Sequence, residues 1–177
     1  MHVKAKTMAF GGLLLALTVI FMVLGSVIET STLFLLAAAS FFVGIVVREF
    51  GLRTGAAFYV AGVILGFAAA PNKFYVFTFA AMGFYIWGRE AAWRQITAHV
   101  RQEKSKVVFL LSKYVIFNIV YIPIVLIFRN MLFTKAVSGT VLTVIIIAGQ
   151  IGLLIYDKAY DYVQVYIWGK MRARVMS

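Results

Sequence analysis

Long apolar blocks make up most of this chain, and they constrain its fold more than any other feature. Of its 177 residues, 63% are hydrophobic and only 13% are charged. A soluble domain of this length needs more charge than that to cover its surface, whereas a transmembrane helix needs about 20 consecutive apolar residues. The sequence therefore predicts an all-α, multi-pass membrane protein.

Six apolar blocks are candidate transmembrane helices, and we expect them to form one domain, a six-helix bundle. Gly51 and Pro71 interrupt helices between blocks, and Thr30 or Ser31 is expected to cap the second helix. The second block is short for a full crossing, so shielding by neighbours or a thinned bilayer is expected there. The predicted spans are about 8–28, 33–47, 54–70, 74–88, 107–128 and 136–156.

A single long polar run, Arg89–Lys106, separates the first four spans from the last two. Short loops rich in Lys and Arg stay on the cytoplasmic side of a membrane, so this basic run predicts that both termini are cytoplasmic. Lys113, low in the fifth span, is expected to extend toward the same side. On this map the outer basic residues are Lys73, Arg129 and Lys135, and the inner ones are Lys4, Lys6, Arg48, Arg53, Arg89, Arg94, Arg101, Lys104, Lys106, Lys170, Arg172 and Arg174.

The conformation of residues 89–106 has two readings. Trp93, Ile96 and Val100 share one helical face, which predicts an amphipathic helix along the cytoplasmic interface. The alternative is a solvated extension of the fourth span. In both readings the run is an exposed surface for a cytoplasmic partner. The net charge of +11 indicates anionic lipid headgroups rather than nucleic acid, because the basic residues lie mostly at the ends of apolar blocks.

The sequence lacks the motifs of common catalytic and metal sites. It has no phosphate-binding loop for ATP and no cysteine. His2 and His99 are isolated and expected in water, so we expect no metal, haem or other cofactor. Asp157 and Asp161 lie one helical turn apart. Such a pair can serve acid chemistry, but at a helix end beside many cations ion pairing is the stronger reading. We expect a protein that is not an enzyme.

Polar residues at the outer ends of the spans, and deeper in the last two, are the candidates for ligand binding. In a six-helix bundle they could converge on an outward-facing pocket walled by aromatic residues of the fourth span. The alternatives are ordinary turn polarity and, for the two deeper amides, hydrogen bonding between helices. The candidate substrate-binding residues are Glu29, Asn72, Tyr75, Asn118, Arg129 and Gln150.

Small residues recur along two of the predicted helices, where they allow another helix backbone to come close. In the third span Gly62 and Gly66 form such a pattern. In the first span the small residues share one face, which could pack inside the protein or dock on a partner subunit; spacing alone favours internal packing. The residues of this first-span face are Ala5, Ala9, Gly12 and Ala16.

With these features the chain resembles the substrate-binding S component of the energy-coupling factor (ECF) transporters. The first helix reads KAKTMAFGGLLLALTVIFMVLGSVI, with an Ala-x-x-x-Ala-like face that in this family docks on a transmembrane T component. The block VVREFGLRTGAAFYVAGVILGFAAAPNKFYVFTFAAMGFY is similar to uncharacterised bacterial membrane proteins grouped with the family. The likeness covers about the first four spans. It implies a subunit of the bacterial cell membrane that binds a vitamin or other micronutrient and works with a T subunit and two ATPases.

Two further hypotheses come from other functional classes. The protein could be a structural or assembly subunit of a larger membrane complex, which would use its helix faces and the basic run as docking surfaces and need no pocket. It could also be an intramembrane enzyme that acts on lipid. In that case Asp157, Lys158 and Asp161 would line a cleft open to the inner leaflet.

Overall fold

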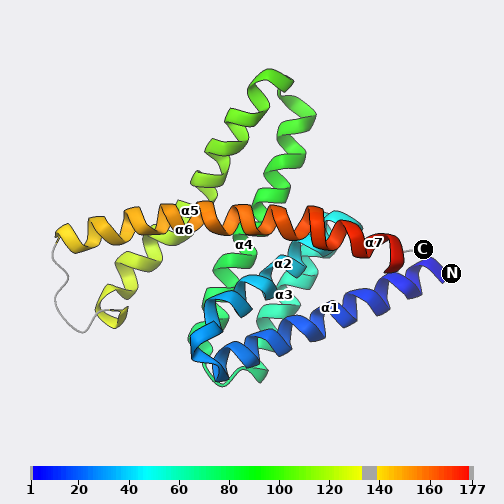
Figure 1. Ribbon diagram of the computed structural model, residues 1–177, viewed down its shortest axis with the longest axis horizontal. Coiled ribbons are helices and arrows are strands. Elements are labelled where there is room, and N and C mark those ends of the chain that lie inside the picture. Colours follow the sequence, from blue (N-terminus) through cyan, green and yellow to red (C-terminus); the bar gives the residue numbers. More distant parts are fainter. Residues whose placement is uncertain (1, 133–138, 176–177) are drawn as a thin grey trace.

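The protein is described here from a computed structural model, and its described parts are helical with no strand (Figure 1). The structure describes residues 2–132 and 139–175, and the side chains of residues 8–127 and 139–172. The elements are α1 (His2–Val27), η1 (Glu29–Ser31), α2 (Thr32–Phe50), α3 (Leu52–Ala69), α4 (Lys73–His99), α5 (Gln102–Leu132), α6 (Gly139–Tyr162), the π-helical segment η2 (Val163–Trp168) and α7 (Gly169–Val175).

The described residues confirm the all-α prediction. Five of their helical segments are long and apolar enough to cross a membrane, which is compatible with a multi-pass membrane protein. The predicted fourth span, 74–88, forms the first half of α4, which is not among the five. The charged and polar residues from Arg89 onward shorten the apolar part of this helix. The five segments are Met8–Val27, Glu29–Phe50, Leu52–Ala69, Gln102–Ile127 and Gly139–Arg172.

The first four helices pack into a bundle in which α2 contacts each of the other three. Lipid is as apolar as these side chains, so close packing rather than water exclusion holds such helices together. Glycines provide the close approach: a β-carbon on Gly66 of α3 would lie 2.8 Å from Met22 Cε of α1, and one on Gly62 would lie 3.3 Å from Phe79 Cζ of α4. The close-contact pattern predicted for Gly62 and Gly66 is confirmed.

The connections at the two ends of α2 differ from the sequence predictions. Gly51 alone separates α2 from α3, with φ at +91°, a conformation that favours glycine. The expected helix break at Gly51 is thus confirmed. The helix α2 extends past both ends of the predicted span 33–47, so the prediction of a short span is wrong. The expected side-chain cap is also wrong: Ser31 makes no such bond, and Thr32 Oγ1 instead donates to the Gly25 carbonyl at 2.8 Å.

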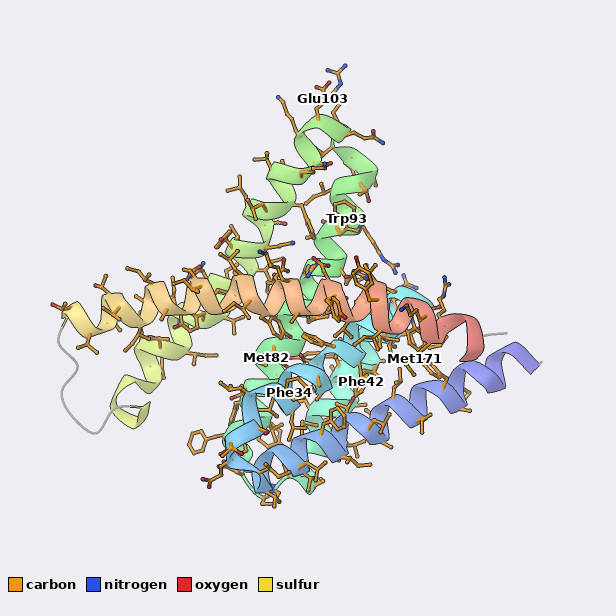
Figure 2. The ribbon with its side chains drawn as sticks, in the orientation of Figure 1. Phe34, Phe42, Met82, Trp93, Glu103 and Met171 are labelled. Carbon is orange, nitrogen blue, oxygen red and sulfur yellow. The ribbon has the colours of Figure 1, made fainter. Side chains whose placement is uncertain are left out.

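The basic run 89–106 does not form a separate interfacial helix. It is the second half of α4, a turn at Val100 and Arg101, and the first turns of α5. Figure 2 shows Glu103 at the tip of this α4–α5 hairpin. The apolar face of the run packs against the neighbouring helix, since the Trp93 and Phe109 ring centroids lie 4.8 Å apart. Residues 89–99 continue the helix of the predicted fourth span, as in the alternative reading, but Arg89 and Glu90 are buried rather than solvated.

The segments α6, η2 and α7 form one long rod that crosses the α4–α5 hairpin (Figure 1). The second half of this rod forms several hydrogen bonds with α2. Tyr156 and Ser40 share a hydrogen bond of 2.6 Å between their hydroxyls, and Trp168 Nε1 donates to Glu49 Oε1 at 2.9 Å. The helical rod therefore continues well past Tyr156, where the predicted sixth span ends.

Tyr160 sits directly on a glycine of α2 at the centre of this contact. The Tyr160 side chain is fully buried. A β-carbon on Gly44 would lie only 2.1 Å from the Tyr160 hydroxyl oxygen, so a larger residue there would force the Tyr160 side chain or the rod to shift. The glycine thus allows the close contact between α2 and Tyr160 of α6.

We predict that Gly44→Ala lowers the thermal unfolding temperature of the detergent-solubilised protein, because overpacking at such a contact costs about 1–3 kcal/mol. Gly11→Ala is the matched control, since a β-carbon there meets nothing within 4 Å. Equal unfolding temperatures for Gly44→Ala, Gly11→Ala and the wild type would contradict the packing described here.

Candidate functional site

A cluster of paired charges joins α4, α5 and α6, and we call it the Asp157 cluster: Tyr85, Arg89, Lys113, Asp157 and Asp161. Asp157 Oδ1 accepts from Arg89 Nη1 at 2.6 Å and from the Tyr85 hydroxyl at 2.7 Å, while Oδ2 accepts from Lys113 Nζ at 2.7 Å. Arg89 also pairs with Asp161. Two cations thus face two carboxylates, and the ion pairing predicted for Asp157 and Asp161 is confirmed.

A second ion pair joins α2 to α4 beside this cluster. Arg48 Nη2 and Nε lie 2.7 and 3.0 Å from Glu90 Oε1, and the Tyr160 hydroxyl donates to the same oxygen at 2.7 Å. The Tyr160 ring also lies 4.6 Å from Arg89 Cζ and 5.2 Å from Arg48 Cζ, within cation–π range. Tyr160 therefore connects the two sets of charges.

The burial of Arg89 and Glu90 is a feature that the sequence analysis missed. We expected both in an exposed cytoplasmic run, but they are 3% and 4% exposed. The ammonium group of Lys113 is held by Asp157, and the side of the membrane toward which it extends stays a prediction. The sequence signal for this burial was the spacing of Asp157 and Asp161. This spacing places two carboxylates on one helix face, and cations on the helices opposite can be buried by pairing with them.

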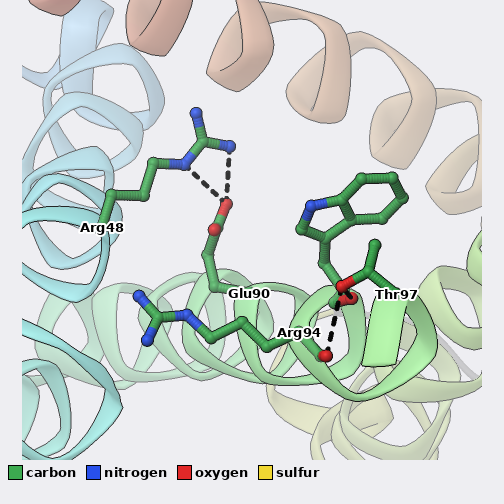
Figure 3. Close-up of a pocket in the computed structure, with 5 residues that line it drawn as sticks. Arg48, Glu90, Arg94 and Thr97 are labelled. Atoms are coloured by element: carbon green, nitrogen blue, oxygen red, sulfur yellow. Dashed lines mark hydrogen bonds and ion pairs between the residues drawn. The ribbon is translucent and has the colours of Figure 1, made fainter. Parts of the chain in front are cut away.

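An open hollow of about 430 Å³ lies next to the Arg48–Glu90 pair (Figure 3), and we call it the arginine hollow. Its lining comes from the end of α2 and the second half of α4. Arg94 Nη2 donates to the Val47 carbonyl at 2.7 Å, which anchors that guanidinium beside the α2 terminus. Two guanidinium groups and one carboxylate thus share the hollow. Its lining residues are Arg48, Glu90, Trp93, Arg94 and Thr97.

Of the predicted substrate-binding residues, the structure brings together Asn118 and Gln150. Asn118 Nδ2 donates to Gln150 Oε1 at 3.1 Å, and Gln150 Nε2 donates to Asn118 Oδ1 at 2.9 Å. This reciprocal pair joins α5 to α6, which is the hydrogen bonding between helices that the sequence analysis gave as the alternative. The amide groups satisfy each other at a depth where a polar group without a partner is costly.

The other predicted substrate-binding residues lie elsewhere. Glu29 is exposed at the start of η1, and Tyr75 is half-buried in the first turn of α4. Asn72 caps α4, with its Oδ1 accepting from Phe74 N at 3.0 Å. The side chain of Arg129 lies outside the described residues. A pocket shared by the six residues therefore stays a prediction.

The small-residue face of α1 points away from the rest of the protein. Ala9, Gly12 and Ala16 are exposed, and a β-carbon on Gly12 would meet nothing within 4 Å. The internal packing favoured by spacing alone is therefore wrong for these residues, because α1 contacts its neighbours through another face that includes Leu14 and Thr18. The side chain of Ala5 lies outside the described residues.

Comparisons with protein-family models, curated proteins and solved structures give no match.

We predict that Asp157→Asn strongly destabilises the protein, because it leaves the buried Arg89 and Lys113 with one carboxylate fewer. Removing one partner of a buried ion pair costs about 3–5 kcal/mol. Unfolding in detergent would measure the loss. Glu103→Gln is the control, since it removes the same charge at an exposed position.

A double variant tests whether the stability lost in Asp157→Asn comes from the unpaired charge of Lys113 or from other effects of the substitution. We expect Lys113→Met combined with Asp157→Asn to recover part of the lost stability, because it removes the ammonium group that Asp157 neutralises. If the two losses simply add, the Lys113–Asp157 pair contributes no coupling and the cluster does not work as described.

Proposed function

We propose that this protein is a non-catalytic integral membrane subunit that binds another membrane protein through the exposed face of α1. The observation that carries this proposal is the exposure of Ala9, Gly12 and Ala16 on a helix long enough to cross a membrane. The side chains at these three positions are small, so the backbone of another helix can approach closely there and gain van der Waals contacts and weak hydrogen bonds.

The proposed topology has six spans with both termini on the cytoplasmic side. It includes the first half of α4 as the fourth span, because Val76, Phe79 and Ile86 are fully buried among helices that are themselves candidate spans. The basic residues at the inner ends support the orientation. We propose the bacterial cell membrane as the location, on the basis of the resemblance to the ECF family.

In its specific form, the proposal is a substrate-binding S component of an ECF-type importer for a vitamin or other micronutrient. Its partners would be a T subunit, which docks on the α1 face, and two ATPases that supply the energy. The exposed position of the α1 face supports this form, since an S component needs such a face free for docking. The proposed ligand site remains the set at Glu29, Asn72, Tyr75, Asn118, Arg129 and Gln150.

A structural or assembly subunit is the second candidate, and a different observation favours it. Asn118 and Gln150 bond to each other, and Asn72 caps α4. Three of the polar residues expected to hold a substrate thus already have structural roles. A subunit of this kind would use the same α1 face for docking but would bind no solute.

Affinity purification of the tagged protein from its native cells in mild detergent, followed by mass spectrometry, tests both candidates. We expect a T-type membrane subunit and two ATPases to copurify with the wild-type protein. Recovery of a different membrane complex instead would reject the transporter and support the assembly subunit.

Gly12→Leu tests the docking face directly, because its side chain would fill the space that a partner helix needs. We expect this variant to lose the copurifying partner. Gly152→Leu is the matched control: Gly152 is exposed on α6, and a β-carbon there also meets nothing within 4 Å. Retention of the partner by Gly12→Leu would show that α1 is not the docking face.

A further inference from the structure

The arginine hollow has hydrogen-bond donors that the protein itself does not use. Arg48 directs Nε and Nη2 to Glu90, and Arg94 directs Nη2 to the Val47 carbonyl. Within the described residues, no hydrogen bond engages Arg48 Nη1 or the Nε and Nη1 atoms of Arg94. The Arg48 side chain is 34% exposed at the hollow. Both guanidiniums can therefore donate to a ligand.

The charges of the hollow suit a singly charged anion. Arg48 and Arg94 carry two positive charges and Glu90 carries one negative charge, so the lining has a net charge of one positive unit. Glu90 Oε1 already accepts from Arg48 and from Tyr160, which reduces its repulsion of an anion. Guanidinium groups bind phosphate oxygens well, because their planar N–H groups match the spacing of two oxygens.

The position of the hollow favours a phosphate that belongs to a lipid. It lies at the end of α2, which is a candidate membrane span up to Phe50. Trp93, 40% exposed, forms part of its wall, and tryptophan is enriched at the depth of lipid headgroups. Thr97 lines the hollow one turn further along α4, where its hydroxyl donates to the Trp93 carbonyl at 2.8 Å. A headgroup phosphate would reach these residues from the adjoining leaflet.

We infer that the arginine hollow binds the phosphate of an anionic phospholipid headgroup at the cytoplasmic surface of the membrane. Arg94 and Arg48 hold the phosphate oxygens, and Trp93 covers the adjoining glycerol carbons. The site is separate from the α1 face and from the predicted substrate pocket, so it does not depend on the proposed partner or substrate, while its cytoplasmic location rests on the proposed topology.

Lipid-dependent thermal stabilisation tests this inference, since a ligand that binds only the folded state raises the unfolding temperature. The detergent-solubilised protein is titrated with phosphatidylglycerol and, separately, with phosphatidylcholine. We expect phosphatidylglycerol to raise the unfolding temperature more. We expect the Arg94→Gln variant to bind phosphatidylglycerol about tenfold more weakly or worse, because a hydrogen bond to a charged group contributes about 1.5–3 kcal/mol.

Control variants separate this site from general attraction to a basic protein. Arg101→Gln removes the same charge from the exposed α4–α5 turn and should keep the lipid response. Thr97→Glu places a carboxylate at the hollow without removing the bond between Arg94 and Val47, and should abolish the response. Gln95→Glu adds the same charge at an exposed position outside the lining and should retain more of the response than Thr97→Glu.

Two results would overturn the inference. One is an equal response to phosphatidylglycerol in the wild type, Arg94→Gln and Thr97→Glu, which would mean that the lipid acts elsewhere. The other is an equal shift with inorganic phosphate or glycerol phosphate at the same concentration, which would mean that the hollow binds a soluble phosphate rather than a lipid headgroup.

Discussion

The buried pairing of Arg89 and Lys113 with Asp157 is the interaction on which the arrangement of the last three long helices depends. A charge without a partner in a low-dielectric environment costs several kcal/mol. Arg89 is on α4, Lys113 on α5 and Asp157 on α6. No one of these three helices can keep its charged residue buried without the partners on the other two. The pairing therefore fixes the three helices relative to one another.

Tyr160 connects the Asp157 cluster to the arginine hollow. Tyr160 lies between the two sets of charges, with its ring near Arg89 and its hydroxyl on Glu90. Gly44 allows this position by leaving room for the phenol. Because Glu90 is occupied by Tyr160 and Arg48, the remaining donors of Arg94 face an open space with a net positive charge. A contact that holds helices together thus also prepares a surface for an anion.

Sequence patterns predicted the local features of this fold but not its long-range pairings. The apolar blocks and the break at Gly51 each depend on a few neighbouring residues. The burial of Arg89 depends on a partner 68 residues away, and its immediate neighbours, Glu90 among them, look like the start of a polar loop. The arginine hollow combines α2 and α4 in the same way, so no single stretch of sequence indicated it.

The small-residue faces show why periodicity predicts a contact surface without naming its partner. Gly44 and Gly66 have large side chains of other helices against them, from Tyr160 and Met22. Gly12 also has small residues about one helical turn away on each side, at Ala9 and Ala16. Nothing, however, lies within 4 Å of the position of its β-carbon. All three positions give a backbone surface that another helix can approach. Since the contacts of Gly44 and Gly66 are satisfied inside the protein and that of Gly12 is not, the face of α1 is the surface that we propose for a second membrane protein.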